Sequence, residues 1–233
     1  MLRKFSNTRS VFFGRAGLIF FMAFLCSSYS GKQTVLIHSH NDYQKNIPFY
    51  RAYSQQVHTI EADIYAAPAS DGLLVAHDPH ELDSALSLDE MYLEPLIFLF
   101  GQNEGRPWRG SEQVLTLMID LKTPLHPTID RLIAKLKRHP EVFDPSVNPY
   151  AVRIVISGSR PDPEAFGEYP RFISFDGFID VDYTPQQLER VAFISEPFFR
   201  YSKWKGGADT LSAEDRQVIE SLVAKSHKTG KPI

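Results

Sequence analysis

The 233-residue sequence has few cysteines, no long apolar run and no large excess of charge of either sign. Its single cysteine, Cys26, excludes a disulfide scaffold. A count of 25 basic against 28 acidic residues gives a net charge of −3, which argues against a nucleic-acid binder with a basic patch. Internal repeats, low-complexity linkers and a glycine-rich phosphate loop are also missing. A hydrophobic fraction of 43% still allows a full core, so we expect a globular protein.

The first thirty residues have the pattern of a signal peptide. Basic residues at positions 3, 4, 9 and 15 come without any acidic residue, and the ten-residue apolar run Ala16–Leu25 follows at once. Such a run suits the core of a signal peptide and is too short to span a bilayer as a helix. Ser28 and Ser30 are small residues suited to cleavage before Gly31. We therefore expect residues 1–30 to be removed.

Cleavage would leave residues 31–233 as a secreted or periplasmic domain with a net charge of −7 and no cysteine. Two alternatives stay open, a retained N-terminal anchor and a lipid anchor at Cys26. Leu25 stands where a bacterial lipobox has a small residue, which disfavours lipidation. Cleavage and export are the preferred interpretation.

Short apolar runs alternate with helical patterns along the rest of the chain. The expected strands are Thr34–His38, His58–Ile64, Leu73–His77, Val114–Leu121, Val152–Ile156, Phe172–Phe178 and Val191–Ile194. The expected helices are Pro48–Val57, Ser87–Leu99, Thr128–Arg138 and Ala213–His227, the last with Ser212 as N-cap and Gly230 as C-cap signal.

Strands separated by helical crossovers predict an α/β fold with a parallel sheet and helices outside it. Seven strands without a glycine-rich phosphate loop favour a TIM-type (β/α)8 barrel over a doubly wound sheet. The sequence ends at Ile233, where another strand is expected to begin. The barrel is therefore expected to be incomplete at its C-terminus, or to be an open variant.

Four polar clusters each fall at the C-terminal end of a predicted strand. They are His38-Ser-His40-Asn41-Asp42, Glu61-Ala-Asp63, His77-Asp78 and Asp120-Leu-Lys122. Taken singly, each cluster is most simply a set of solvated residues at the end of a strand. In a parallel barrel, however, the C-terminal strand ends share one face, where active sites gather. Their common position therefore predicts a single site.

Glu61 and Asp63 are two apart on a strand, so their side chains point to the same side. Two carboxylates that point together into a barrel repel each other unless a cation holds them. Asp120 can add a third oxygen ligand from a nearby strand, and an all-oxygen set suits Ca²⁺ or Mg²⁺ better than Zn²⁺. His40 and His77 then remain for proton transfer, which histidine performs near neutral pH.

In chain order these motifs are His40, Glu61-Ala-Asp63, Asp71-Gly72, Val75-Ala-His77-Asp78 and Ile119-Asp-Leu-Lys122. This order resembles the phosphatidylinositol phospholipase C-like phosphodiesterase superfamily, which includes glycerophosphodiester phosphodiesterases and the spider-venom type of phospholipase D. The segment His38–Tyr43 is most similar to a branch with bacterial secreted proteins and fungal Aim6-like proteins. The resemblance covers about residues 34–233, and its motifs end near Thr123.

The resemblance implies a TIM-type barrel, two histidines as acid and base, and a divalent cation held by the E-x-D pair and a later acid. The residues that match these roles are His40 and His77 as acid and base, and Glu61, Asp63 and Asp120 as metal ligands. Lys122 matches a lysine that contacts the phosphate. The looser match of Ser157–Arg160 adds Arg160 as a second substrate-binding candidate.

This sequence lacks the His-Arg-Gly motif of the glycerophosphodiesterases, so the choice between His38 and His40 stays open. We prefer His40 because its short spacing to Glu61 resembles the venom phospholipase branch. His38 is then a strand-end residue that supports the site.

The expected activity is hydrolysis of a small-molecule or lipid-headgroup phosphodiester, with transient contact to a membrane surface and with no nucleic acid or obligate protein partner. The choice of Ca²⁺ or Mg²⁺ stays open, as does attack by water or by a neighbouring substrate hydroxyl. The loops Gly101–Gly110, with Trp108, and Arg200–Gly207, with Trp204, are candidates for headgroup or sugar contact. Core packing is the alternative for both tryptophans.

Two other functions fit parts of the pattern. One is a hydrolase of the amidohydrolase or PHP kind, in which His38 and His40 bind Zn²⁺ or Mn²⁺ directly. The other is a non-catalytic or truncated barrel that binds phosphorylated headgroups. Metal content distinguishes the first from a phosphodiesterase, and binding without turnover identifies the second.

Overall fold

The computed structural model describes residues 35–207 and 209–233. The expected signal peptide, its cleavage before Gly31 and the alternative lipid anchor at Cys26 lie outside the described residues. Within the described part, no helix combines the length and apolar character needed to cross a membrane. The fold given below is that of the unit Leu36–Ile233.

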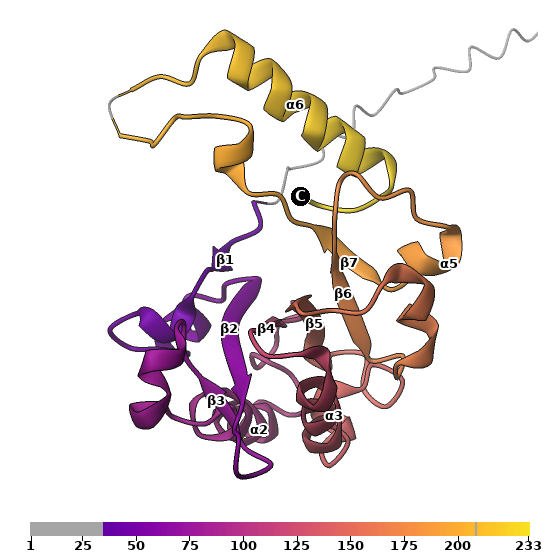
Figure 1. The fold of residues 1–233 in the computed structure, drawn as a ribbon. Helices are drawn as coiled ribbons and strands as arrows, with labels where there is room; N and C mark the ends of the chain where they lie inside the picture. The colour runs from indigo at the N-terminus through magenta and orange to yellow at the C-terminus, as the bar shows by residue number, and fades with distance from the viewer. Residues whose placement is uncertain (1–34, 208) are drawn as a thin grey trace, which may run out of the picture. The chain divides into compact units, whose positions relative to one another are not determined.

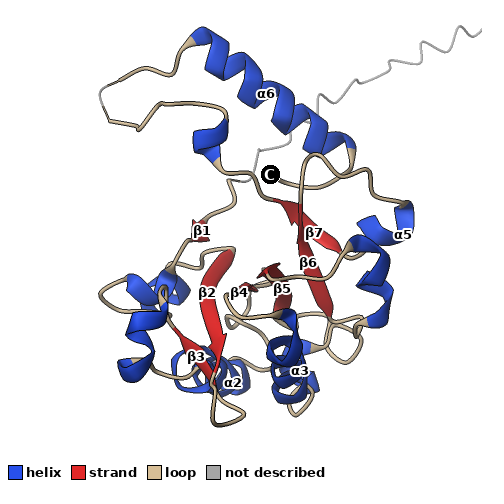
Figure 2. Cartoon of the chain, in the orientation of Figure 1, coloured by secondary structure: helices blue, strands red, loops and turns tan. Residues whose placement is uncertain are grey.

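Seven strands form one sheet (Figures 1 and 2). They are β1 (His38–Ser39), β2 (Thr59–Ala66), β3 (Leu73–Val75), β4 (Thr116–Leu121), β5 (Arg153–Gly158), β6 (Ile173–Gly177) and β7 (Val191–Ile194). Each overlaps one predicted strand. Six of them follow the order β1-β2-β4-β5-β6-β7, with every neighbouring pair parallel. These six strands curl through 212°, an α/β arrangement compatible with an incomplete TIM-type barrel.

Strand β3 departs from the predicted all-parallel sheet because it pairs with β2 in the antiparallel direction. Residues 67–72 connect the two strands, and the N–H of Ala67 donates to the carbonyl of Gly72 at 2.9 Å. A parallel crossover needs about a dozen residues or more, so a connection this short makes the chain fold back as a hairpin. The expectation that His77 follows a parallel strand is therefore wrong.

Helices connect most of the parallel strands. They are α1 (Tyr50–Ser54), α2 (Glu94–Gln102), α3 (Leu125–Leu136), α4 (Pro140–Phe143), α5 (Pro185–Leu188) and α6 (Ala213–Lys228). Helix α6 begins as predicted, since the Ser212 hydroxyl accepts a hydrogen bond from the N–H of Asp215. Gly230, with φ of 75°, follows its C-terminus. Helix α3 packs against β2, β3 and β4.

Alternate residues of the central strands face two different environments. In β2, Ile60, Ala62 and Ile64 belong to the hydrophobic core that includes residues of α3, whereas Glu61 and Asp63 point to the opposite face. Strand β4 repeats this alternation, with Leu117, Ile119 and Leu121 in the core and Asp120 on the other face. The apolar residues therefore attach the sheet to its helices, and the polar ones gather on the face turned away from α3.

Candidate active site

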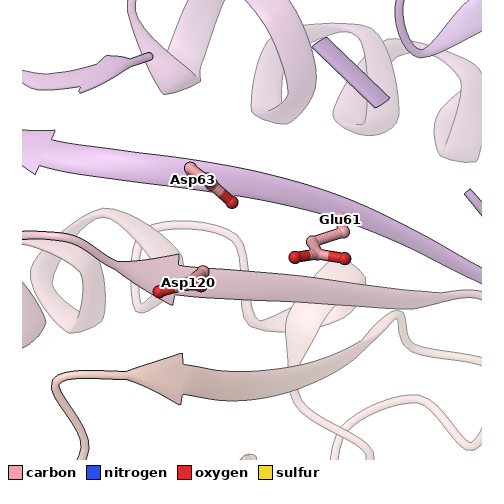
Figure 3. A group of neighbouring side chains, drawn as sticks. All are labelled: Glu61, Asp63 and Asp120. Carbon is pink, nitrogen blue, oxygen red and sulfur yellow. The ribbon is translucent and has the colours of Figure 1, made fainter. Parts of the chain in front are cut away.

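Three carboxylates converge on the polar face of the sheet (Figure 3). Glu61 and Asp63 project from β2, and Asp120 projects from β4, where it is the register partner of Asp63. One oxygen of each side chain lies within 4.8 Å of an oxygen of the other two. The structure thus brings together the three predicted metal ligands. The two-residue period of β2 and the parallel register with β4 account for this.

The donor set fits a hard divalent cation. The Asp63 side chain is 1% exposed, and its Oδ1 is buried without a hydrogen-bond partner. Glu61 is buried and Asp120 is half-buried, and carboxylates this close repel each other unless positive charge lies between them. An all-oxygen set with an unpartnered buried oxygen suits Ca²⁺ or Mg²⁺. Among the described residues, these three carboxylates form the group of acidic, histidine or cysteine side chains that could hold a metal, and no histidine belongs to it.

Lys122 supplies positive charge to this cluster. Its Nζ lies 2.9 Å from Oδ2 of Asp63 and 2.9 Å from Oδ2 of Asp120. Burial lowers the pKa of Lys122, but the hydrogen bonds to the Asp120 and Asp63 carboxylates outweigh it, so the pKa is raised. Lys122 therefore stays charged, and the structure places this predicted phosphate contact between two of the candidate metal ligands.

The histidines of the first motif differ in their contacts. Nε2 of His38 lies 2.6 Å from Oε2 of Glu61. The His40 ring lies beside that of His38, with 6.2 Å between the ring centroids, and its side chain is exposed at the edge of the cavity described below. His38 thus holds a carboxylate of the cluster, and His40 faces open space next to it.

His77 reaches the cluster through the β2–β3 hairpin. Its Nδ1 lies 3.3 Å from Oδ2 of Asp63 and 3.1 Å from the hydroxyl of Tyr43. The Tyr43 hydroxyl in turn donates to Oδ2 of Asp63 at 2.8 Å. Burial, then the hydrogen bond to Asp63 and the Asp63 charge, raise the pKa of Tyr43, so its hydroxyl keeps its proton. Asp63, Tyr43 and His77 therefore form one hydrogen-bonded group.

Arg160 belongs to a second polar group, where β5 and β6 end. Its Nη1 donates to Oδ2 of Asp176 at 3.3 Å, and the Ser157 hydroxyl donates to the same oxygen at 3.1 Å. The guanidinium lies 3.8 Å from the centroid of the Phe178 ring. Burial raises the pKa of Asp176, although the charge of Arg160 and the hydrogen bonds from Ser195 and Ser157 oppose that shift.

A cavity of about 560 Å³ joins the two polar groups. The charged and titratable side chains that line it are His38, His40, Glu61, Asp120, Arg160, Asp176 and Glu196. The exposed side chains of Phe178 and Phe199 form an apolar part of its wall. This volume lies within the range of small-molecule sites.

The two predicted loop tryptophans have different surroundings. Trp108 is 6% exposed, and its Nε1 donates to the carbonyl of Tyr53 at 2.9 Å, so it is a packing residue. Trp204 is 39% exposed and lies near Phe198, with 6.0 Å between ring centroids. Of the two predicted headgroup contacts, the Trp204 loop alone keeps an accessible tryptophan.

Three residues of the site were given no role from the sequence. Tyr43 contacts Asp63 and His77, Asp176 holds Arg160, and Gly158 packs against Asp120. Gly158 has φ of 68°, and a Cβ atom there would lie 2.0 Å from Oδ1 of Asp120. The signal for Gly158 and Asp176 is that each lies within two residues of the end of a predicted strand. Tyr43 follows the His-Ser-His-Asn-Asp motif, but the sequence gives no indication of its partners.

Residues 29–143 match the AIM6-like phosphodiesterase domain. This stretch contains His40, Glu61-Ala-Asp63, His77 and Asp120-Leu-Lys122, whereas Arg160 lies beyond it. No solved structure matches the chain significantly.

Three curated relatives are fungal proteins with nearly the same name. Altered inheritance of mitochondria protein 6 of Eremothecium gossypii is 32% identical over 97 residues, which is 37% of this chain and 25% of the relative. Its counterpart in Kluyveromyces lactis is 34% identical over 70 residues, 30% of this chain and 17% of the relative. The homolog in Arthroderma benhamiae is 33% identical over 104 residues, 37% of this chain and 32% of the relative.

The matched part of this chain thus spans a third or less of these relatives. Together with the domain match, the relatives confirm the predicted resemblance to the Aim6 branch of the phospholipase C-like phosphodiesterases.

Proposed function

Since residues 29–143 carry an Aim6-branch phosphodiesterase-type domain, we propose that the chain is a secreted, metal-dependent phosphodiesterase. Its substrate is a glycerophosphodiester or a phospholipid-headgroup diester. The carrying observation is the acidic cluster, in which oxygens of Glu61, Asp63 and Asp120 lie within 4.8 Å of one another and Oδ1 of Asp63 is buried without a partner. Lys122 supplies one positive charge to the three carboxylates, and a divalent cation would supply the rest. Phosphodiester hydrolysis would use that cation to stabilise negative charge on the phosphate.

Glu61, Asp63 and Asp120 would hold the divalent cation. When bound, Ca²⁺ or Mg²⁺ acts there as a Lewis acid toward a phosphate oxygen. His38 orients Glu61 through its 2.6 Å contact, and Lys122 keeps positive charge between Asp63 and Asp120. Both contacts fix ligands before substrate arrives.

Proton transfer is assigned to His77 and His40. Nδ1 of His77 faces Asp63 and Tyr43, which leaves Nε2 as the nitrogen that exchanges a proton with the substrate. His40 is exposed at the cavity, and its imidazole can reach a bound diester from that side. One histidine takes the proton of the attacking hydroxyl, and the other gives a proton to the departing alcohol oxygen.

Arg160 binds substrate from the opposite wall. Its side chain is 9% exposed, and Nη2 is buried without a hydrogen-bond partner although Nη1 donates to Asp176. A guanidinium with an unused donor next to a cavity suits a phosphate or headgroup oxygen. Attack by water gives a phosphomonoester and the released alcohol, whereas attack by a substrate hydroxyl gives a cyclic diester and the released alcohol. ³¹P NMR of the products distinguishes these routes.

The cluster argues against the amidohydrolase or PHP alternative. Direct metal binding through His38 and His40 would need their nitrogens in the ligand group, and in the described residues that group consists of carboxylates. Nε2 of His38 is instead engaged with Glu61.

The test is hydrolysis of bis(p-nitrophenyl) phosphate and glycerophosphocholine by the purified chain in EDTA, Mg²⁺ or Ca²⁺. Turnover that needs a divalent cation is expected, with loss in Glu61→Gln and His77→Ala. Glu141→Gln, at an exposed carboxylate of α4, is the matched control and should keep full activity. A folded chain that binds the diesters but never cleaves them would establish the non-catalytic barrel instead.

Secretion is tested separately. Expression of the full chain with its own N-terminus should yield protein outside the cytoplasm that starts at Gly31. N-terminal sequencing that finds the first thirty residues intact would contradict the proposed cleavage, and a lipid-modified Cys26 would support the anchored alternative.

A further inference from the structure

The segment that carries Tyr43 is fixed by a buried carboxylate. Asp42 is 1% exposed and accepts hydrogen bonds from the Ser39 hydroxyl at 2.7 Å, the Phe49 N–H at 2.5 Å and the Tyr92 hydroxyl at 3.1 Å. Asn41, with φ of 46°, turns the chain immediately before it. Because three donors hold Asp42 from different elements, the neighbouring Tyr43 has little freedom to move away from the acidic cluster.

The Tyr43 hydroxyl lies between a metal-ligand candidate and a candidate proton-transfer residue. It is 2.8 Å from Oδ2 of Asp63 and 3.1 Å from Nδ1 of His77. A hydroxyl has a single proton, and an anionic carboxylate is a stronger acceptor than a neutral imidazole nitrogen. The shorter contact to Asp63 therefore takes the proton, and the Tyr43 oxygen offers His77 lone pairs.

Nδ1 of His77 then faces two acceptors. One is the Tyr43 oxygen, and the other is Oδ2 of Asp63 at 3.3 Å, an oxygen that Lys122 and Tyr43 also contact. A neutral imidazole satisfies two acceptors at Nδ1 only when that nitrogen carries the proton. The unprotonated nitrogen is then Nε2, on the part of the ring away from Asp63.

We propose that Tyr43 is a positioning residue that fixes His77 as its Nδ1–H tautomer by presenting an acceptor oxygen to Nδ1. The consequence for the reaction rests on the proposed function above, since a histidine fixed in this way can take a proton only at Nε2. Orientation of one imidazole nitrogen by a hydrogen-bonding partner is a general way of preparing the other for chemistry.

The chain offers a matched control. The hydroxyl of Tyr65 also contacts His77, but it donates to the backbone carbonyl at 3.0 Å and not to the ring. Tyr43→Phe and Tyr65→Phe therefore each remove one hydroxyl that touches the same residue, and only the first removes an acceptor from the imidazole. An effect common to both variants would be structural.

The experiment is a two-bond ¹H–¹⁵N correlation spectrum of the ¹⁵N-histidine-labelled chain at alkaline pH, with His77 assigned from His77→Asn. The wild-type chain and Tyr65→Phe should show His77 protonated at Nδ1. Tyr43→Phe leaves Nδ1 with only the longer 3.3 Å contact to Asp63 and should show a mixture of the two tautomers. If the diesterase activity is present, Tyr43→Phe should lower kcat about 10–100-fold, with Tyr65→Phe near wild type.

A proton on Nε2 of wild-type His77 overturns the proposal without any variant, and so does an unchanged tautomer in folded Tyr43→Phe. The spectra need no substrate and no metal. A wild-type chain with no turnover would therefore contradict the proposed function. The tautomer assignment would still be decided by the spectra alone.

Discussion

Gly158 packs so closely against Asp120 that no side chain fits between them. A Cβ atom at position 158 would lie 2.0 Å from Oδ1 of Asp120 and 2.6 Å from the carbonyl oxygen of Leu121. The φ of 68° at Gly158 adds a conformation that other residues rarely adopt. Asp120 is a candidate metal ligand, so the absence of a side chain at Gly158 determines where the Asp120 carboxylate can lie.

Gly158→Ala should therefore weaken metal binding as well as stability. The added methyl group displaces the Asp120 carboxylate, and we expect the affinity for Mg²⁺ or Ca²⁺ to fall about 10–100-fold, as when a neighbour of a metal ligand is altered. The left-handed conformation should cost about 1–3 kcal/mol of unfolding free energy. Isothermal titration calorimetry and urea unfolding measure the two effects.

Gly110→Ala separates the effect on metal affinity from the effect on stability. Gly110 has φ of 71°, but a Cβ atom there meets nothing within 4 Å. This variant should lose only the conformational part of that stability, because its Cβ meets no backbone atom, and it should keep its metal affinity. Equal affinities in the two variants would show that the contact with Asp120 does not position a ligand.

His38 and His40 should respond differently to substitution. His38 holds Glu61 at 2.6 Å, so His38→Ala should weaken metal binding, and excess cation should restore part of the activity. Within the described residues, His40 makes no contact with an oxygen of the acidic cluster. His40→Ala should therefore keep the metal affinity, but its kcat should fall about 10²–10⁴-fold because an acid or base is missing. The reverse pattern of metal affinity and kcat would assign proton transfer to His38.

The sequence predicted the strands well because their apolar runs are local features. It also predicted that Glu61 and Asp63 share a face, since that follows from the two-residue period of a strand. The expected parallel direction of β3 was wrong, although the sequence held the information: six residues between Ala66 and Leu73 cannot make a parallel crossover, and the Asp71-Gly72 turn signal lies in that connection.

The remaining features depend on contacts between distant segments. Tyr43 and Asp63 are 20 residues apart, and their hydrogen bond depends on how Asp42 is held by three other elements. Lys122 was predicted as a phosphate contact from the resemblance, but its amine also bridges Asp63 and Asp120, which follows from the β2–β4 register. Nothing in the local sequence specifies that register.

The stability of the loop after His77 should depend on pH, because the Glu81 carboxylate holds its backbone. Oε2 of Glu81 accepts hydrogen bonds from the N–H of Asp78 at 3.2 Å and of His77 at 2.8 Å. The bond from Asp78, then that from His77, lower the pKa of Glu81 below 4.5. A carboxylate with a lowered folded-state pKa stabilises the fold fully above its unfolded pKa and loses that contribution as the pH falls through the folded value. The contribution is therefore present at neutral pH and lost in the acid range below 4.5.

The amide shifts of His77 and Asp78 in ¹H–¹⁵N spectra should accordingly move together as the pH falls below 4.5. Glu81→Gln keeps an acceptor oxygen but cannot titrate, so this movement should vanish. Glu90→Gln removes another carboxylate whose pKa is lowered, by the Ser87 hydroxyl and N–H, and should leave the His77 amide unaffected. A His77 amide that still titrates in Glu81→Gln would refute the link.

The loop 198–207 should contact anionic membrane surfaces. Phe199 is 81% exposed and Trp204 is 39% exposed, and the exposed Lys203 and Lys205 flank that tryptophan. Aromatic side chains next to cations suit an interface of anionic headgroups. Phe199 also lines the 560 Å³ cavity of the candidate site, so contact here would bring a headgroup diester to it. Because the chain has two tryptophans and the other is buried, Trp108→Phe leaves Trp204 as the sole reporter.

In Trp108→Phe, Trp204 emission should shift to the blue with phosphatidylglycerol–phosphatidylcholine vesicles and stay unchanged with phosphatidylcholine alone. High salt should reverse the shift, because screening weakens attraction between exposed charges. Lys203→Glu combined with Lys205→Glu should abolish it, and Trp204→Phe, which keeps only buried Trp108, should show no response. If anionic vesicles leave the Trp204 emission unchanged, the loop acts only as part of the cavity. A shift with neutral vesicles would show that the lysines do not direct the contact.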